Sequence, residues 1–256
     1  MCVKDRSIDK LPKQLIGILA GSAAPYYRLE VNPAIWFLSA LIFVQVIYTM
    51  AKRIRLEYIL AWILPILGLI MSIYKDNSFL PLNIDVAFFL YPFWIVGITF
   101  KDKIDSLSNS DSKREKVAIL TVSLLLLIVL YPLSQSGGIN IYRLQYGNNI
   151  FLYYLKGIIG SVGMIGISIC LQGFRFSYLF ESLGKNTIVV LCYHQIFTFL
   201  TLHFVNAFAE RVNTVAFFVL KYGAFCFMMG IMYILCLLIN KYFPWIIGKR
   251  NIFKKG

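Results

Sequence analysis

Seven long apolar runs, joined by polar connections, constrain this chain more than any other feature of its sequence. Each run approaches the ~20 residues that a helix needs to cross the hydrocarbon core of a bilayer. Backbone at that depth must satisfy its own hydrogen bonds, and the runs lack the alternation of barrel strands. The predicted spans are residues 34–51, 57–74, 82–100, 116–134, 150–172, 187–207 and 215–238. The sequence therefore predicts an all-α, polytopic transmembrane helix bundle, a single domain over residues 1–256.

Composition supports this class. Hydrophobic residues make up 59% of the 256 residues and charged residues only 14%, whereas soluble domains are roughly half apolar and a quarter charged. One aqueous core cannot hide that much apolar surface, so the surplus faces the lipid bilayer. The net charge of +13 points to anionic lipid or a phosphorylated ligand and away from nucleic acid, because no soluble domain carries a nucleic-acid motif.

The Lys and Arg residues concentrate on the side of the predicted membrane that holds the C-terminus. The positive-inside rule therefore places the C-terminus in the cytoplasm. On that side, the cluster Lys52-Arg53-Ile54-Arg55 either anchors the topology or holds the phosphates of a donor such as acetyl-CoA through charge-assisted hydrogen bonds. The connection over residues 101–116, also on that side, is charged and rich in Ser, which predicts a flexible loop.

Both histidines of the chain, His194 and His203, lie in the sixth predicted span. At ~1.5 Å per residue, His194 lies roughly 10 Å below the polar turn Gly184–Thr187 that opens this helix. The histidines are nine positions apart, which at ~100° per residue places them on opposite helix faces. Thr198 and Thr201 share the face of His194. An imidazole at this depth acts as a general base towards a sugar hydroxyl or orients an acyl group; a packing histidine bonded to a neighbouring carbonyl or Tyr is the alternative.

Small residues and cysteines have simpler interpretations. Gly157, Gly160, Gly163 and Gly166 recur at every third position of the fifth span, which predicts close helix packing. No strand precedes them, so they do not form a dinucleotide fingerprint. The five cysteines contain no C-x-x-C pair, so neither a metal site nor a disulfide framework is predicted.

Three segments, in matching order and spacing, resemble the acyltransferase family 3 of membrane proteins, with the fucose 4-O-acetylase-like branch the most similar. The resemblance spans the chain from about Lys13 onward. The first segment, similar to the family's WFL-x-AL segment, is Asn32-Pro33-Ala34-Ile35-Trp36-Phe37-Leu38-Ser39-Ala40-Leu41. The second, similar to its FF…G…K helix, is Phe88-Phe89 with Gly97 and Lys101. The third, similar to its late LGKNS…H helix, is Gly184-Lys185-Asn186-Thr187 with His194.

The resemblance implies an O-acyltransferase, usually an O-acetyltransferase, that uses cytoplasmic acetyl-CoA as its co-substrate. The implied acceptor is a sugar or lipid-linked glycan of a bacterial surface polysaccharide or related glycoconjugate, and the implied location is the bacterial cytoplasmic (inner) membrane. His194 matches the family's late histidine and becomes the candidate catalytic residue. The candidate substrate- or donor-binding residues include two arginines of the basic cluster and the two threonines that share the face of His194. They are Trp36, Arg53, Arg55, Lys185, Asn186, Thr198 and Thr201.

The chain departs from the family at its start. Members typically have more helices, and the first of them carry an Arg and a His regarded as central to catalysis. This chain opens just before the segment similar to WFL-x-AL, so we expect an N-terminally truncated or split member that lacks the first helices. We expect its activity alone to be impaired, with a separately encoded N-terminal part as a partner. A non-enzymatic polytopic membrane protein, such as a glycan transport component or an inactive remnant of the family, is the alternative.

Overall fold

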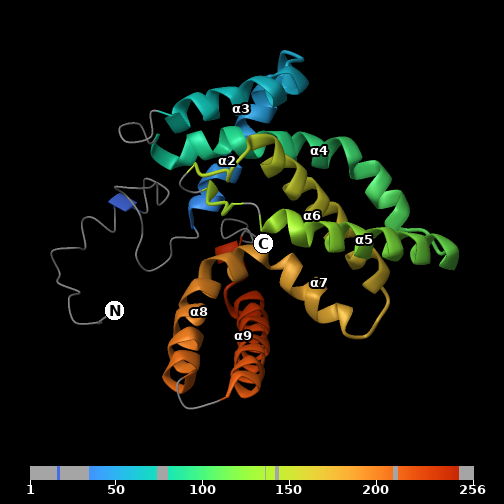
Figure 1. Ribbon diagram of the computed structural model, residues 1–256, viewed down its shortest axis with the longest axis vertical. Helices are drawn as coiled ribbons and strands as arrows, with labels where there is room; N and C mark the ends of the chain where they lie inside the picture. The colour runs from blue at the N-terminus through green and yellow to red at the C-terminus, as the bar shows by residue number, and fades with distance from the viewer. Residues whose placement is uncertain are drawn as a thin grey trace, which may run out of the picture. The chain divides into compact units, whose positions relative to one another are not determined.

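The computed structural model describes residues 16–17, 35–73, 80–135, 137–141, 144–209 and 213–247. Within these ranges the chain forms α-helices and short 3-10 turns and no β-strand (Figure 1). The prediction of an all-α fold is therefore confirmed. The helices group into two compact units, one over residues 36–172 and one over residues 173–256, and each is described by itself.

Among its described residues the first unit contains five long helices, four of which form two tightly packed pairs. Its elements are α2 (Ile35–Arg53), α3 (Glu57–Ile73), the 3-10 turn η2 (Pro81–Asn83), α4 (Ile84–Ser108), α5 (Lys113–Ser134) and α6 (Ile150–Leu171). Helix α3 packs on α4, and α5 lies along α6 (Figure 1). One cluster of buried apolar side chains surrounds Phe89 and Tyr153 of α4 and α6, and a second surrounds Leu64 and Tyr91 of α3 and α4.

Glycines in α6 allow its neighbours to approach closely. A Cβ atom at Gly163 would lie 3.0 Å from the Leu127 side chain of α5, and one at Gly157 would lie 2.5 Å from the Phe93 ring of α4. A Cβ atom at Gly166 would overlap the Ser123 hydroxyl of α5. The predicted packing role of the glycine series is therefore confirmed.

The prediction of a flexible loop over residues 101–116 is wrong. Helix α4 runs through the first half of this segment and α5 begins before its end, so only residues 109–112 connect the two helices. Lys101 pairs with Asp105 at 3.0 Å one turn further along α4, which supports the end of that helix. The Ser112 side chain accepts a hydrogen bond from the backbone three residues on and caps α5. The charged residues and serines of this segment therefore belong to the solvated end of α4 and the solvated start of α5.

The second unit is built on a helical hairpin. Its elements are α7 (Ser177–Lys185), α8 (Thr187–Ala209), α9 (Thr214–Tyr242) and the 3-10 turn η4 (Pro244–Ile247). Helices α8 and α9 lie side by side, and α7 packs against the C-terminal half of α9 (Figure 1). Leu183 of α7, Val189 of α8 and Met232 and Cys236 of α9 form the buried cluster that joins them.

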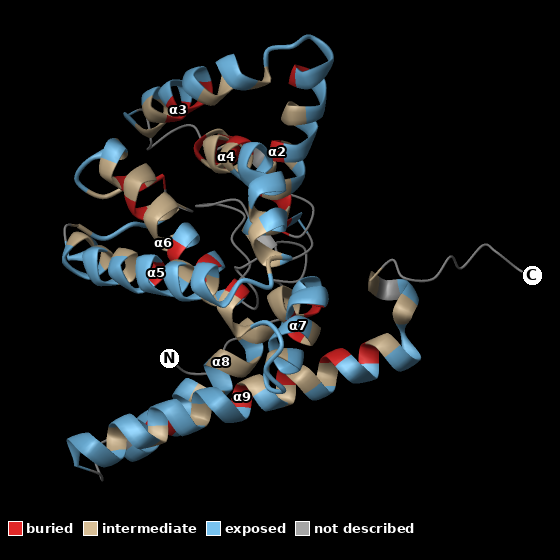
Figure 2. Cartoon of the chain, turned by 90° about the vertical axis from the view of Figure 1, so that its right-hand side faces the viewer, coloured by how far each residue is buried: buried red, intermediate tan, exposed pale blue. Residues whose placement is uncertain are grey.

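Each of the seven predicted spans overlaps an α-helix. Among the described residues, five helices are long and apolar enough to cross a membrane, namely α4, α5, α6, α8 and α9; α3 is apolar but shorter, with 17 residues. Large apolar side chains lie on the surface, with Trp62 exposing 80% and Phe227 70% of their area, and α9 is exposed along most of its length (Figure 2). Soluble proteins rarely expose contiguous apolar surface of this extent. The chain is a multi-pass helical membrane protein.

Candidate functional site

His194 lies half-buried on α8, and its ring orientation is defined by its own helix. The Nδ1 atom lies 3.0 Å from the carbonyl oxygens of both Val190 and Leu191. Because carbonyl oxygens only accept hydrogen bonds, Nδ1 must carry the proton. In the neutral ring the lone pair then belongs to Nε2, which is the form that a general base requires.

The helical phase predicted for the two histidines is confirmed. His203 is exposed on the opposite face of α8 from half-buried His194. Thr198 and Thr201, on the His194 face, are also partly buried. The Thr198 hydroxyl donates to Met228 Sδ of α9 at 3.5 Å, and the Thr201 hydroxyl donates to the Phe197 carbonyl at 2.6 Å. Thr198 therefore faces α9. The hydroxyl oxygens of Thr198 and Thr201 keep lone pairs that can accept a further hydrogen bond.

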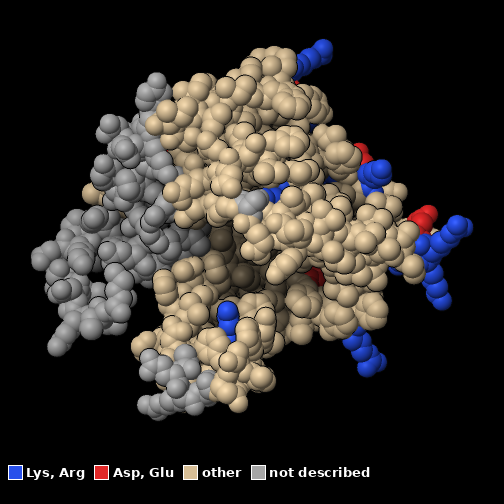
Figure 3. All heavy atoms as spheres, in the orientation of Figure 1, with Lys and Arg blue, Asp and Glu red and all other residues tan. Residues whose placement is uncertain are grey.

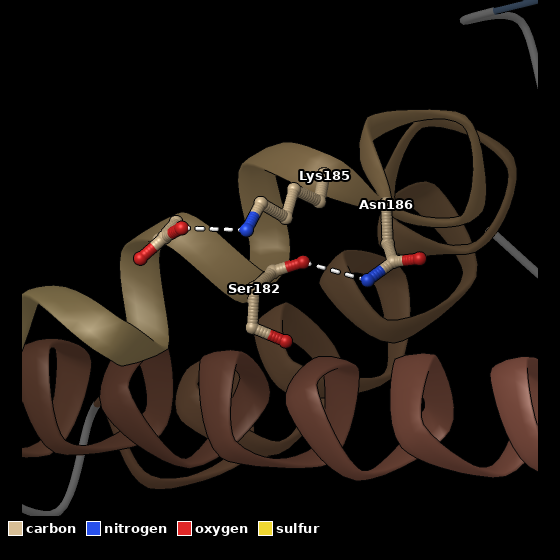
Figure 4. Close-up of polar contacts among 4 residues, drawn as sticks. Ser182, Lys185 and Asn186 are labelled. Atoms are coloured by element: carbon tan, nitrogen blue, oxygen red, sulfur yellow. Dashed lines mark hydrogen bonds and ion pairs between the residues drawn. The ribbon is translucent and has the colours of Figure 1, made fainter.

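The polar segment before α8 is an elbow between two helices. Gly184 and Lys185 belong to α7, and only Asn186 separates α7 from α8, so the prediction of a turn over Gly184–Thr187 is wrong for most of its residues. Lys185 Nζ pairs with Glu181 Oε1 at 2.6 Å on the exposed face of α7 (Figure 4). The hydrogen bond to Glu181, and then its negative charge, raise the pKa of Lys185, so this side chain is a cation at neutral pH.

Asn186 is the buried member of the elbow, with only 6% of its surface exposed. Its Nδ2 donates to the Ser182 carbonyl at 2.7 Å, toward which it points in Figure 4. Its Oδ1 accepts a hydrogen bond of 2.7 Å from Asn240 Nδ2 of α9, which also donates to the Cys236 carbonyl. A buried amide with these partners joins the elbow to α9. Asn240 was not predicted as a site residue, because its only signal in the sequence is a lone amide at the end of the last apolar run.

Trp36, Arg53 and Arg55 belong to the first unit, whereas the other candidate residues belong to the second. Trp36 is partly buried, packs against the Phe89 cluster and meets the Phe37 ring edge-on at 5.8 Å between centroids. Arg53 and Arg55 are exposed at the turn from α2 to α3, where Arg55 has a positive φ of 58° that reverses the chain. The structure thus brings Arg53 and Arg55 together at the α2–α3 turn, whereas Trp36 lies at the opposite end of α2. The candidates of the second unit lie along α7 and α8.

The chemistry available along α7 and α8 is that of a proton acceptor and a cation. His194 Nε2 can accept a proton from a hydroxyl group, and Lys185 can bind an anion that takes the place of Glu181. No group of three or more His, Cys, Asp or Glu side chains suited to a metal lies in the part of the chain that the structure describes.

Comparison with known proteins identifies the family. The sequence profile of a family described as "Acyltransferase domain" matches residues 14–241, which include all the long helices almost to the end of α9. No curated protein and no solved structure shows a significant match. The chain belongs to acyltransferase family 3, as its three motifs predicted. Its assignment to the fucose 4-O-acetylase-like branch stays a prediction.

Proposed function

We propose that the chain is a membrane O-acetyltransferase that moves an acetyl group from acetyl-CoA to a sugar hydroxyl of a bacterial surface polysaccharide or lipid-linked glycan. Membership of the acyltransferase family supports acyl transfer. The observation that carries the proposal is the orientation of His194, whose Nδ1 bonds to two carbonyls of α8 and whose Nε2 is therefore the basic nitrogen.

The proposed reaction uses His194 first as a base and then as an acid. Nε2 takes the proton of the acceptor hydroxyl while the hydroxyl oxygen attacks the thioester carbonyl carbon. The carbon–sulfur bond then breaks, and the imidazolium returns the proton to the thiolate that leaves. The carbonyl oxygens of Val190 and Leu191 hold the ring in place and stabilise its charged form throughout. General base catalysis of this kind contributes typically ~10²–10⁴-fold.

The remaining candidate residues receive more limited roles in this proposal. Lys185, Arg53 and Arg55 are exposed cations suited to the phosphates of the donor. Asn186 is a positioning residue, since both ends of its amide are occupied by protein groups. Thr198 and Thr201, on the His194 face of α8, shape the surface beside the substrate. The predicted binding role of Trp36, in the first unit, stays a prediction. The basic side of the chain, with its C-terminus, lies in the cytoplasm of a bacterial cell, where acetyl-CoA is available.

The proposal is tested in bacterial membranes that contain a glycan acceptor and express the chain together with any separately encoded N-terminal part. Radioactive acetyl transfer from acetyl-CoA to the glycan is measured for the unaltered chain, for His194→Ala and for His203→Ala. We expect His194→Ala to lower the rate by roughly 10²–10⁴-fold. The control variant His203→Ala removes an exposed ring from the opposite face of the same helix and should keep the rate. Equal losses in both variants would contradict a specific role for His194.

A further inference from the structure

A cavity of about 530 Å³ lies between α4, α5 and α6, within the first unit. Its lining is almost entirely apolar and includes Phe93, Val96 and Phe100 of α4, Val122 of α5 and Ile165 of α6. None of the candidate catalytic or donor-binding residues lines it. The substrates of the proposed reaction therefore do not account for this cavity.

The long dimension of the cavity matches one leaflet of a bilayer. Its lining follows α4 from Phe93 to Leu107, which at ~1.5 Å per residue is roughly 21 Å. The part between Phe93 and Phe100 belongs to the apolar stretch of α4 and extends roughly 10 Å. Half of the hydrocarbon core of a bilayer is about 15 Å thick. An extended hydrocarbon chain that enters from the leaflet surface is thus held along most of its length.

The polar end of the cavity carries a positive charge. Lys103 is the only charged residue among the described residues of the lining. It lies just beyond Phe100, at the depth expected for lipid headgroups. Lys101, two residues earlier, is neutralised by Asp105, whereas Lys103 makes no ion pair with any described residue. A cation at the mouth of an apolar cavity complements a phosphate attached to a hydrocarbon chain.

The surroundings of Lys103 favour a lipid of net negative charge. Lys113, Arg114 and Lys116 begin α5 on the same side, and with Lys103 they outnumber the acidic neighbours Asp102, Asp111 and Glu115 by four to three. Figure 3 shows blue and red side chains gathered at the right-hand edge, where α4 ends and α5 begins in Figure 1. Basic residues next to a membrane span attract anionic lipids by about 1 kcal/mol each.

We propose that this cavity binds one acyl chain of an anionic phospholipid, whose phosphate pairs with Lys103. The lipid belongs to the leaflet on the side of the α4–α5 connection, which is the predicted cytoplasmic side. Gly97 supplies the space, because a Cβ atom there meets no atom within 4 Å, unlike those of the α6 glycines that touch their neighbours. None of its lining residues belongs to the unit that carries His194, and the proposal does not depend on acyl transfer.

Native mass spectrometry of the purified full chain tests the proposal. The chain is reconstituted with phosphatidylglycerol or with zwitterionic phosphatidylcholine, transferred to mild detergent, and the lipid that it retains is counted. We expect one retained phosphatidylglycerol and weaker retention of phosphatidylcholine. Lys103→Gln should weaken retention of phosphatidylglycerol about tenfold, because it removes one charge-assisted hydrogen bond. The matched control is Lys101→Gln, which changes a paired lysine outside the lining and should leave retention unchanged.

A second pair of variants tests the cavity itself. Gly97→Phe fills the open space beside α4 and should abolish retention of both lipids, whereas Gly230→Phe, also in open space but on α9, should not. Thermal unfolding of each variant separates loss of the site from loss of the fold. Equal retention of the two lipids, unchanged retention in folded Gly97→Phe, or a second copy of the chain bound in place of lipid would each overturn the proposal.

Discussion

The side chain of His194 illustrates how a helix can set the chemistry of a residue that it carries. An imidazole turned back onto the carbonyls of Val190 and Leu191 has a fixed tautomer and presents Nε2 away from its own backbone. The contacts with these carbonyls are also those expected of a packing histidine, which the sequence left as the alternative. The two interpretations differ in what Nε2 does, so only measurements of proton transfer distinguish them.

The pair Asn186 and Asn240 gives a prediction about stability. Asn240→Ala leaves the Oδ1 atom of buried Asn186 without its donor on α9. An intramolecular hydrogen bond contributes about 0.5–1.5 kcal/mol, so the free energy of unfolding should fall by about that amount. Denaturant unfolding of the purified chain in detergent measures it.

Asn206→Ala provides the comparison for that experiment, because Asn206 is an exposed residue of α8. Its replacement should change the free energy of unfolding far less. Similar values for the two variants would show that the link between the elbow and α9 contributes nothing to stability.

Residues that are neighbours along a helix were predictable from the sequence, and residues joined across the fold were not. The opposite orientation of His194 and His203 follows from the helical repeat alone. The contact of Asn186 with Asn240 joins residues 54 positions apart, and no spacing rule reveals such a pair. Sequence analysis therefore found Asn186 through a motif and missed its partner.

Helix boundaries were the least predictable features of the elements. Apolar content places the centre of each span, but its end depends on local polar contacts such as the Lys101–Asp105 pair and the Ser112 cap. These contacts extend α4 and α5 into the segment expected to be a loop. The same effect brings Gly184 and Lys185 into α7.

The packing of α5 against α6 gives a second prediction. Gly166→Ala places a methyl group against the Ser123 hydroxyl, and overpacking of this kind costs about 1–3 kcal/mol. The melting temperature of the purified chain should therefore fall. Adding Ser123→Ala removes the clashing oxygen and should restore much of the loss. Gly223→Ala, in open space on α9, should not lower the melting temperature; a fall as large as that of Gly166→Ala would contradict this explanation.

For the whole molecule, the positive-inside rule predicts which connections lie on which side of the membrane. A cysteine-free variant is given one new cysteine, by Asn109→Cys between α4 and α5 or by Gly138→Cys after α5; both positions are exposed. A membrane-impermeant thiol reagent should label Asn109→Cys only from the cytoplasmic side and Gly138→Cys only from the outer side.

The labelling experiment has two informative alternatives. Labelling of both positions from one side would show that α5 does not cross the membrane, although it has the length and hydropathy to do so. Exchange of the two sides would place the C-terminus outside the cytoplasm. The exchange would also place the basic α2–α3 turn, with Arg53 and Arg55, on the side away from the source of acetyl-CoA.

The role of His194 as a base is tested most directly by chemical rescue. Acetyl transfer from acetyl-CoA to a sugar acceptor is measured for His194→Ala with increasing imidazole in solution. Asn186→Ala is the control, because this variant is expected to lose rate through altered positioning and not through loss of the base. We predict a rate lowered by roughly 10²–10⁴-fold in His194→Ala, which imidazole partly restores, and no such recovery in Asn186→Ala. Transfer by His194→Ala at the unaltered rate would contradict the proposed mechanism.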